Sequence, residues 1–173
     1  PQEVFTEVHR NPVSANPDDM RGNLRKAVEL LKEAGWEVKN GVLTNVKIGQ
    51  PMRVEVLLVS PLFERIVQPY LRNLERLGIR GAIRMVDSAQ YTRRLNVFDY
   101  DIVVGNFAQS ESPGNEQRDF WGSEAADREG SQNLIGVKSA AIDKLVDHVI
   151  FAKDRSELVA ATRALDRVLQ WNE

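Results

Sequence analysis

One almost continuously apolar segment, residues 54–59 (VEVLLV), constrains the fold of this chain more than any other segment. A strand that is apolar on both faces has to be covered on both sides, which is typical of a central strand in a parallel sheet. Residues 61–77 come next and carry an apolar stripe at helical spacing, and Gly78 ends this expected helix. The stripe consists of Ile66, Tyr70, Leu74 and Leu77. A buried strand followed by an amphipathic helix is the first half of a βαβ unit.

The same alternation continues as far as residue 105. The pattern predicts a strand at 79–86, a short helix at about 88–94 and a further strand at 98–105. Successive strands that are joined by helices pair in parallel. We therefore predict an α/β fold in which helices are layered on a mixed, mostly parallel sheet.

Two elements are expected before the apolar segment. A helix over about 18–34 starts at Asn16-Pro17-Asp18-Asp19, because proline suits the first turn and the acids face the positive end of the helix dipole. The apolar positions of this helix are Leu24, Val28, Leu31 and Ala34. Asn40-Gly41 then joins residues 36–39 and 42–44 in a hairpin, since this dipeptide tolerates the positive φ angles of a type I′ turn.

The regular alternation stops after Gly105. Residues 106–117 are an expected polar loop, and Asp119-Phe120-Trp121 are expected to begin a short helix. Two amphipathic helices follow, at about 139–152 and 154–171. The sequence shows no internal repeat, and we predict one domain.

Composition excludes several classes of protein. The 173 residues include 23 Lys+Arg and 25 Asp+Glu, a formal net charge of −2, which argues against binding nucleic acid through an excess of cations. The chain has no cysteine, so it has no disulfide, thiolate metal site or thiol nucleophile, and its two histidines are far apart in the sequence. No stretch approaches the roughly 20 apolar residues that span a bilayer. We expect a protein that needs no cofactor or metal and has no nucleic-acid partner.

Asp99 and Asp101 are the pair of residues that suggests catalysis. Because they lie two positions apart on the strand expected at 98–105, their carboxylates point to the same side. Such a pair could share a proton or bind a cation, so a hydrolase fragment that uses it is the alternative to a binding function. In the interpretation that we favour, one carboxylate caps a loop and the other is solvated.

The loop after Gly105 is the candidate ligand site. Ligands of open α/β sheets bind beyond the carboxyl ends of the strands. The candidate residues are Asn106, Phe107, Ala108, Gln109, Ser110 and Glu111. Their hydrogen-bonding groups surround one aromatic ring and include no base with a partner, which suits binding of a polar ligand better than catalysis. The pattern alone leaves an ordinary surface loop as an equal alternative.

Several long segments resemble one protein family. Residues 21–45 (RGNLRKAVELLKEAGWEVKNGVLTN), 54–79 and 85–105 are similar to peptide-binding proteins of bacterial ABC importers. This is the large extracellular solute-binding family that includes the dipeptide- and oligopeptide-binding proteins. Residues 112–136 (SPGNEQRDFWGSEAADREGSQNLIG) resemble its YejA-like branch, typified by oligopeptide and microcin C binding proteins. The resemblance covers essentially the whole chain.

The resemblance implies one lobe of a type II periplasmic-binding-protein-like fold, with a role in transport and not in catalysis. Members of the family have two lobes joined by a hinge, and the ligand is buried between them. By analogy, residues 1–18 enter from the other lobe, and residues 19–173 form the ligand-binding lobe, which corresponds to the C-terminal one. The implied partners are an oligopeptide or peptide-like ligand, the other lobe and an ABC permease in the inner membrane, and the implied location is the periplasm.

The resemblance also suggests how the amino end of a bound peptide is recognised. In relatives that bind free peptides, a Trp after the matching strand is followed three residues later by an Asp that pairs with the α-amino group. The Trp position falls on Asn106 or Phe107, of which strand alternation favours Phe107, and the Asp position falls on Gln109 or Ser110. Because a buried ammonium without a counter-ion is costly, we expect peptides whose amino end is blocked or held elsewhere. Glu111 is the nearby acid that would restore the usual pairing.

Overall fold

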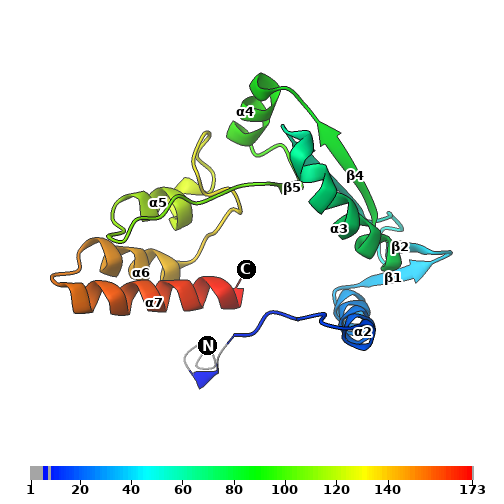
Figure 1. Ribbon diagram of the computed structural model, residues 1–173, viewed down its shortest axis with the longest axis horizontal. Coiled ribbons are helices and arrows are strands. Elements are labelled where there is room, and N and C mark those ends of the chain that lie inside the picture. Colours follow the sequence, from blue (N-terminus) through cyan, green and yellow to red (C-terminus); the bar gives the residue numbers. More distant parts are fainter. Residues whose placement is uncertain (1–5, 8, 173) are drawn as a thin grey trace. The chain divides into compact units, whose positions relative to one another are not determined.

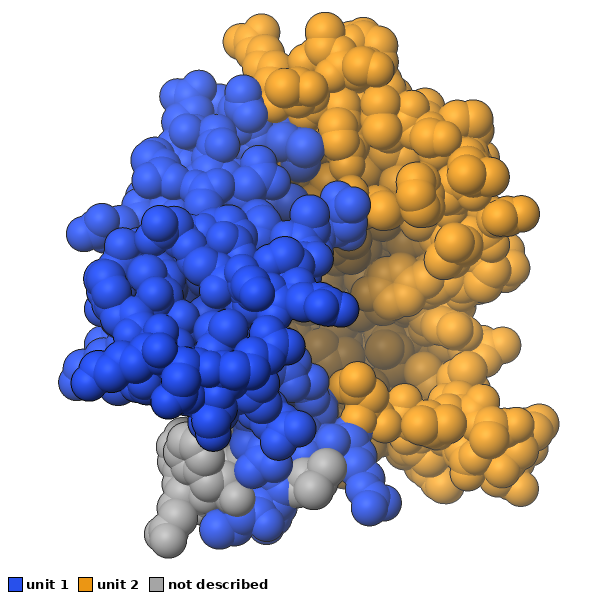
Figure 2. Space-filling view, turned by 60° about the vertical axis from the view of Figure 1, so that its left-hand side comes forward, with its two compact units in different colours: residues 1–10, 95–98, 105–173 blue, residues 11–94, 99–104 orange. Residues whose placement is uncertain are grey.

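The computed structural model describes residues 6, 7 and 9–172, and the chain divides into two compact units (Figure 2). Unit 1 comprises residues 1–10, 95–98 and 105–173, and unit 2 comprises residues 11–94 and 99–104. The segment predicted to enter from another lobe lies partly outside the described residues. Within it, residues 9–14 form no helix or strand, and helix α2 (Pro17–Glu33) begins before residue 18. The single lobe over residues 19–173 stays a prediction.

Unit 2 is built around the predicted central strand. β3 (Arg53–Leu58) lies between β4 (Arg80–Met85) and β5 (Ile102–Val103) and pairs in parallel with both. Residues 56–58 of β3 are at most 1% exposed, as expected of a strand that is covered on both faces. The α/β prediction is confirmed, and the three-stranded sheet is entirely parallel.

The predicted hairpin forms a separate antiparallel sheet. β1 (Trp36–Lys39) pairs with β2 (Val42–Asn45). Asn40 and Gly41 have φ angles of 51° and 76°, in the left-handed region that a type I′ turn requires.

Helix α2 also forms as predicted. The side-chain oxygen of Asn16 accepts hydrogen bonds from the amide N–H groups of Asp18 and Asp19, both at 2.9 Å, and so caps the helix. Leu24 and Leu31 pack against the core around Leu43, Leu77 and Ile79. Val28, which we predicted on the same stripe, is 44% exposed.

The structure corrects the predicted buried face of α3 (Glu64–Arg76), which follows a short 3-10 turn at Pro61–Phe63. Val67 and Leu71 are buried and pack against β3. Ile66 and Tyr70, which we placed on the buried stripe, are 63% and 48% exposed. Ile66-Tyr70 and Val67-Leu71 form two apolar rows that lie one residue apart on the helix. Spacing alone therefore does not show which row faces the sheet.

The last predicted strand is shorter than expected. Helix α4 (Ser88–Asn96) confirms the predicted short helix, but β5 contains only two residues. Asp99 and Asp101 therefore precede the strand, and they have separate partners. The Asp99 carboxylate forms an ion pair with Arg94, whose Nε lies 2.9 Å from Oδ2, and the Asp101 carboxylate accepts from the amide N–H of Glu55 at 2.8 Å. The prediction that both carboxylates share one side of a strand is wrong.

Helices make up the regular structure described in unit 1. α6 (Ala140–Ile150) and α7 (Arg155–Asn172) confirm the two predicted amphipathic helices and run side by side (Figure 1). The core around them includes Ile142, Val146, Val149 and Leu165. α5 (Glu116–Trp121) begins three residues earlier than predicted. Among the described residues, no helix is both long and apolar enough to span a bilayer.

Candidate ligand-binding site

The predicted site loop, residues 106–111, is anchored by its aromatic residue. The loop follows β5 and contains no helix or strand. The ring centroid of Phe107 lies 4.5 Å from that of Trp121 and 5.5 Å from that of Phe120. Phe120 is buried and Phe107 is half-buried, so the Phe107 ring packs on α5 and attaches the start of the loop to this helix.

A buried amide fixes the middle of the loop. Gln117 of α5 is 3% exposed. Its Nε2 donates to Oε1 of Gln109 at 2.7 Å and to Oε1 of Glu116 at 3.2 Å, and its Oε1 accepts from the indole N–H of Trp121 at 3.1 Å. Because both polar atoms of this buried side chain have partners, the side chain of Gln109 is held in a defined position.

The end of the loop is attached to α7. Nη1 of Arg155 donates to the main-chain carbonyl of Glu111 at 2.5 Å. The Oγ of Ser110 accepts from the amide N–H of Ser112 at 3.2 Å, which closes a short turn. The loop therefore combines contacts that hold its backbone with side chains that are exposed from residue 108 to residue 111, a combination that suits ligand binding.

Three of the six predicted residues line one pocket. Gln109, Ser110 and Glu111 form part of the wall of a pocket of about 360 Å³, all of whose lining residues belong to unit 1. The rest of the wall comes from Pro113 and from α5, α6 and α7. The other three predicted residues, Asn106, Phe107 and Ala108, do not line this pocket. The structure therefore brings together the second half of the predicted site.

Sequence reasoning missed the contribution of α7 to this pocket. The lining residues from α7 are Arg155, Leu158, Val159, Thr162, Arg163, Leu165, Asp166 and Leu169. We attributed the apolar positions of this helix to core packing, and Leu165 does belong to the core at 3% exposure. A signal was present, since Arg155, Thr162 and Asp166 interrupt the apolar positions at helical spacing.

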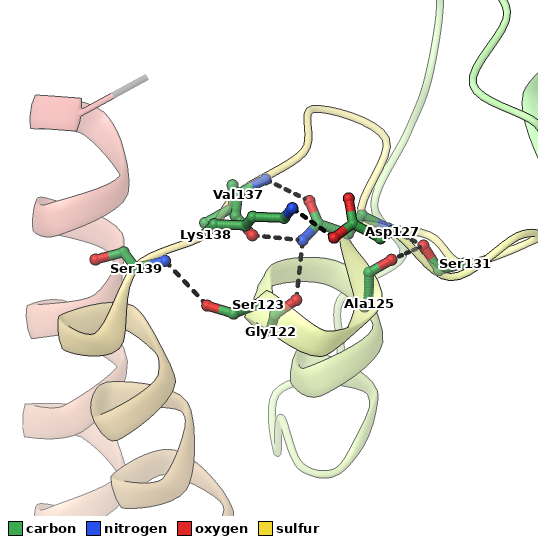
Figure 3. Close-up of polar contacts among 9 residues, drawn as sticks. Gly122, Ser123, Ala125, Asp127, Ser131, Val137, Lys138 and Ser139 are labelled. Atoms are coloured by element: carbon green, nitrogen blue, oxygen red, sulfur yellow. Dashed lines mark hydrogen bonds and ion pairs between the residues drawn. The ribbon is translucent and has the colours of Figure 1, made fainter.

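A buried asparagine holds the chain between α5 and α6. Asn133 is 0% exposed. Its Nδ2 donates to the carbonyls of Gly122 and Val137 at 3.0 and 2.9 Å, and its Oδ1 accepts from the amide N–H of Val137 at 2.8 Å. Further contacts in this segment join Ser131 to Ala125 and Ser139 to Ser123 (Figure 3). Since α5 and α6 both contribute to the pocket wall, this network helps to position the candidate site.

Glu116 at the start of α5 gives the folding of the site a pH dependence. Its carboxylate accepts from the amide N–H of Gly114 at 2.8 Å, and this backbone hydrogen bond is the main cause that lowers the pKa of Glu116. A lowered pKa stabilises the folded state above the unfolded pKa of about 4.3, and the contribution is lost as the pH falls through the folded pKa.

We therefore expect Glu116→Gln to lower the free energy of unfolding by about 1 kcal/mol at pH 7, and by much less below pH 4. Urea unfolding at a series of pH values measures this difference. Glu129→Gln, at an exposed position of the same unit, is the control. A loss that is the same at pH 3 and pH 7 would contradict the assigned role of the ionised carboxylate.

The acids considered for catalysis do not form a catalytic pair. Asp99 and Asp101 are exposed, and each is engaged by a different partner. Within the part of the chain that the structure describes, no group of three or more His, Cys, Asp or Glu residues is placed to hold a metal ion. Because both carboxylates are engaged by groups of the protein itself, the structure gives no support to the hydrolase alternative.

Parallel β–α layers and a pocket lined by a loop are typical of α/β proteins that bind a ligand. The chain belongs to the bacterial extracellular solute-binding proteins, family 5, whose middle-region model matches residues 4–128.

Relatives of known sequence match nearly the whole chain. A protein of Agrobacterium fabrum named probable peptide-binding protein YejA is 52% identical over 172 residues, which are 99% of this chain and 28% of that protein. A second protein of the same organism, named peptidoglycan-binding protein YepA, is 36% identical over 98% of this chain and 27% of its own length. The chain thus spans a little over a quarter of the length of these curated relatives.

A solved structure supports the fold assignment. The oligopeptide-binding protein AppA from Bacillus subtilis, in complex with a nonapeptide, is similar to this chain with a TM-score of 0.71. The similarity covers 84% of this chain and 29% of AppA at 23% sequence identity. The predicted fold class, an α/β fold like that of the periplasmic binding proteins, is thereby confirmed.

Proposed function

We propose that this chain forms a ligand-binding lobe of a periplasmic solute-binding protein that captures oligopeptides for an ABC importer. Membership of family 5 supports a role in solute binding. The name of the A. fabrum relative and the nonapeptide bound to AppA support peptides as the ligand class. The observation that carries the proposal is the loop at residues 106–111, which is attached to α5 and α7 and lines a pocket with three residues.

Capture follows from closure of two lobes on the peptide. A ligand that contacts both lobes binds the closed form more tightly than the open form, so it shifts the population toward closure. In this proposal the present chain supplies one wall of the binding cleft, the other lobe supplies the second, and the closed form docks on the permease in the inner membrane. The ligand passes on without chemical change, so the proposal requires no catalytic residue and no cofactor.

The loop favours a ligand whose amino end is blocked or held elsewhere. Gln109 and Ser110 carry neutral groups, and each already makes a contact within the protein. Neutral amides and hydroxyls bond the carbonyl and N–H groups of a peptide without the need for a charge on the ligand. Glu111 is the carboxylate of the segment 106–111 and is exposed, so an ammonium has no buried counter-ion among these side chains.

Substitution of Glu111 tests this proposal. In the full-length gene product, we expect Glu111→Gln to change the Kd of both penta-alanine and N-acetyl-penta-alanine by less than threefold, as measured by isothermal titration calorimetry. We also expect the acetylated peptide to bind at least as tightly as the free one. Glu129→Gln serves as the control for a change of charge at an exposed site of unit 1.

Two other results are informative. A large loss that is confined to the free peptide would refute the blocked amino end and leave peptide binding intact. Failure of peptides of any length and either end group to bind the unsubstituted protein would show that the proposed function is wrong.

A further inference from the structure

We propose that the pocket between the loop and α7 receives one bulky apolar side chain of the bound peptide and so gives the protein a side-chain preference. This inference rests on the proposed function and adds to it a subsite formed by named residues. Three observations support it: the apolar wall, the balanced charges and the continuity of the pocket with the loop.

The wall of the pocket is largely apolar. Leu158, Leu165 and Leu169 of α7 line it together with Trp121 of α5 and Val149 of α6. Its volume of about 360 Å³ lies at the lower end of the range of about 300–1,000 Å³ for small-molecule sites. This space suits one large side chain and not a whole oligopeptide. Burial of apolar surface would then provide the binding free energy.

The charged residues of the pocket balance one another. Glu111 and Asp166 contribute two negative charges, Arg155 and Arg163 contribute two positive charges, and all four residues are exposed. Because the signs cancel, the pocket has no net charge that would attract a lysine or a glutamate side chain. The apolar wall therefore decides which side chain is preferred.

Thr162 of α7 also lines the pocket. Its Oγ1 is buried, so this hydroxyl is not accessible to a ligand in the pocket. Selection therefore depends on burial of apolar surface, and a large aromatic side chain such as that of tyrosine is the occupant that suits the wall.

The pocket is continuous with the proposed peptide-binding loop. Gln109, Ser110 and Glu111 belong both to the loop and to the wall of the pocket. The main chain of a peptide that is bound along this loop therefore has one of its side chains beside the pocket. This continuity is the reason to assign the pocket to the peptide and not to an unrelated ligand.

A tyrosine scan of the ligand tests the inference in the full-length gene product. The probes are N-acetyl-penta-alanine amide and five peptides of the same length, each with tyrosine at one position. We expect one of the five to bind about tenfold to hundredfold more tightly than the alanine peptide, because it buries one large side chain. Isothermal titration calorimetry measures the six affinities.

A variant that fills the pocket tests whether the pocket causes the gain in affinity from tyrosine. Thr162→Met adds a larger side chain to the wall, and we expect it to abolish the difference in affinity between the tyrosine peptide and the alanine peptide. Ala160→Met is the matched control, because residue 160 lies on the same helix at an exposed position outside the wall. It should leave the gain unchanged.

A photo-cross-linking measurement keeps the test independent of how well the variants fold. A peptide with p-benzoylphenylalanine at the preferred position should attach to residues 158–169. Attachment elsewhere, or a tyrosine gain that persists in a folded Thr162→Met protein, would overturn the assignment of the pocket.

Equal affinity for all six peptides would overturn the side-chain preference but would leave the proposed function standing. This result is expected if another segment of the full-length protein fills the pocket. Absence of binding by any peptide would overturn both proposals.

Discussion

Replacement of Asn133 by aspartate is expected to lower the free energy of unfolding of unit 1 by about 4 kcal/mol or more at pH 7. Nδ2 of Asn133 donates to two carbonyl oxygens, and the side chain is fully buried. A carboxylate in its place turns an oxygen toward the carbonyls of Gly122 and Val137 and leaves both without this donor. Each buried group that loses its partner costs about 1–3 kcal/mol, and the buried charge adds to this loss. Urea unfolding followed by circular dichroism measures the difference.

The pH dependence of this variant identifies the cause. A protonated carboxyl group has one donor again, so Asn133→Asp should recover part of its stability, relative to the unsubstituted protein, as the pH is lowered toward 4. Asn115→Asp is the matched control, since Asn115 is exposed and makes no side-chain cap hydrogen bond to α5. We expect it to change stability by less than about 0.5 kcal/mol. A loss below 1 kcal/mol for Asn133→Asp at pH 7 would contradict the structural role of this residue.

Gly78→Ala is expected to destabilise unit 2 by about 3 kcal/mol. Gly78 has a φ angle of 79°, and a Cβ at this position would lie 2.7 Å from the amide nitrogen of Leu43. The carbonyl of Gly78 accepts a hydrogen bond from that same amide N–H at 2.8 Å. The new methyl group therefore has to push β2 away and break this contact, because the neighbouring atoms belong to the backbone. Thermal and urea unfolding measure the loss.

Gly35→Ala separates the cost of the positive φ angle from the cost of the contact between the new Cβ and β2. Gly35 follows α2 as Gly78 follows α3, and it has a similar φ angle of 83°, but its nearest contact would be a side-chain carbon of Val46 at 3.8 Å. This variant carries only the cost of the backbone conformation, about 1 kcal/mol. Equal losses for the two variants would show that the close approach of Gly78 to β2 has no energetic importance.

Local structure was predictable wherever one physical cue acted over a short segment. The turn at Asn40-Gly41, the start of α2 at residues 16–19 and the apolar strand β3 all follow from neighbouring residues, and the structure has them where the sequence indicates. The order of strands and helices was sufficient for the parallel α/β class. None of these features needs information about distant parts of the chain.

The predictions were wrong where two interpretations of the same short segment fitted the sequence equally well. On α3, Ile66-Tyr70 and Val67-Leu71 are both apolar rows, and only contact with β3 selects the second row. Near β5, alternation placed Asp99 on a strand. The structure instead pairs this residue with Arg94, while the strand is reduced to two residues.

For the site, the sequence indicated the loop but not what surrounds it. Gln109, Ser110 and Glu111 were proposed as binding residues, and they do line a pocket. The residue that fixes Gln109 is Gln117, and the residue that holds the segment between α5 and α6 is Asn133. Neither belongs to a periodic pattern. Their importance depends on burial, which a polar residue in a polar segment does not reveal.

By itself, the sequence determined the strand and helix order, the hairpin turn, the start of α2, the parallel α/β class and the family resemblance. These features depend on residues that are adjacent or regularly spaced along the chain. The tertiary structure decided which apolar row of α3 is buried, that α7 completes the pocket of the loop, and that a buried asparagine holds the segment between α5 and α6. These features depend on contacts between residues far apart in sequence. Such contacts exist only after the chain has folded, since the free energy of burial depends on what each side chain finally packs against.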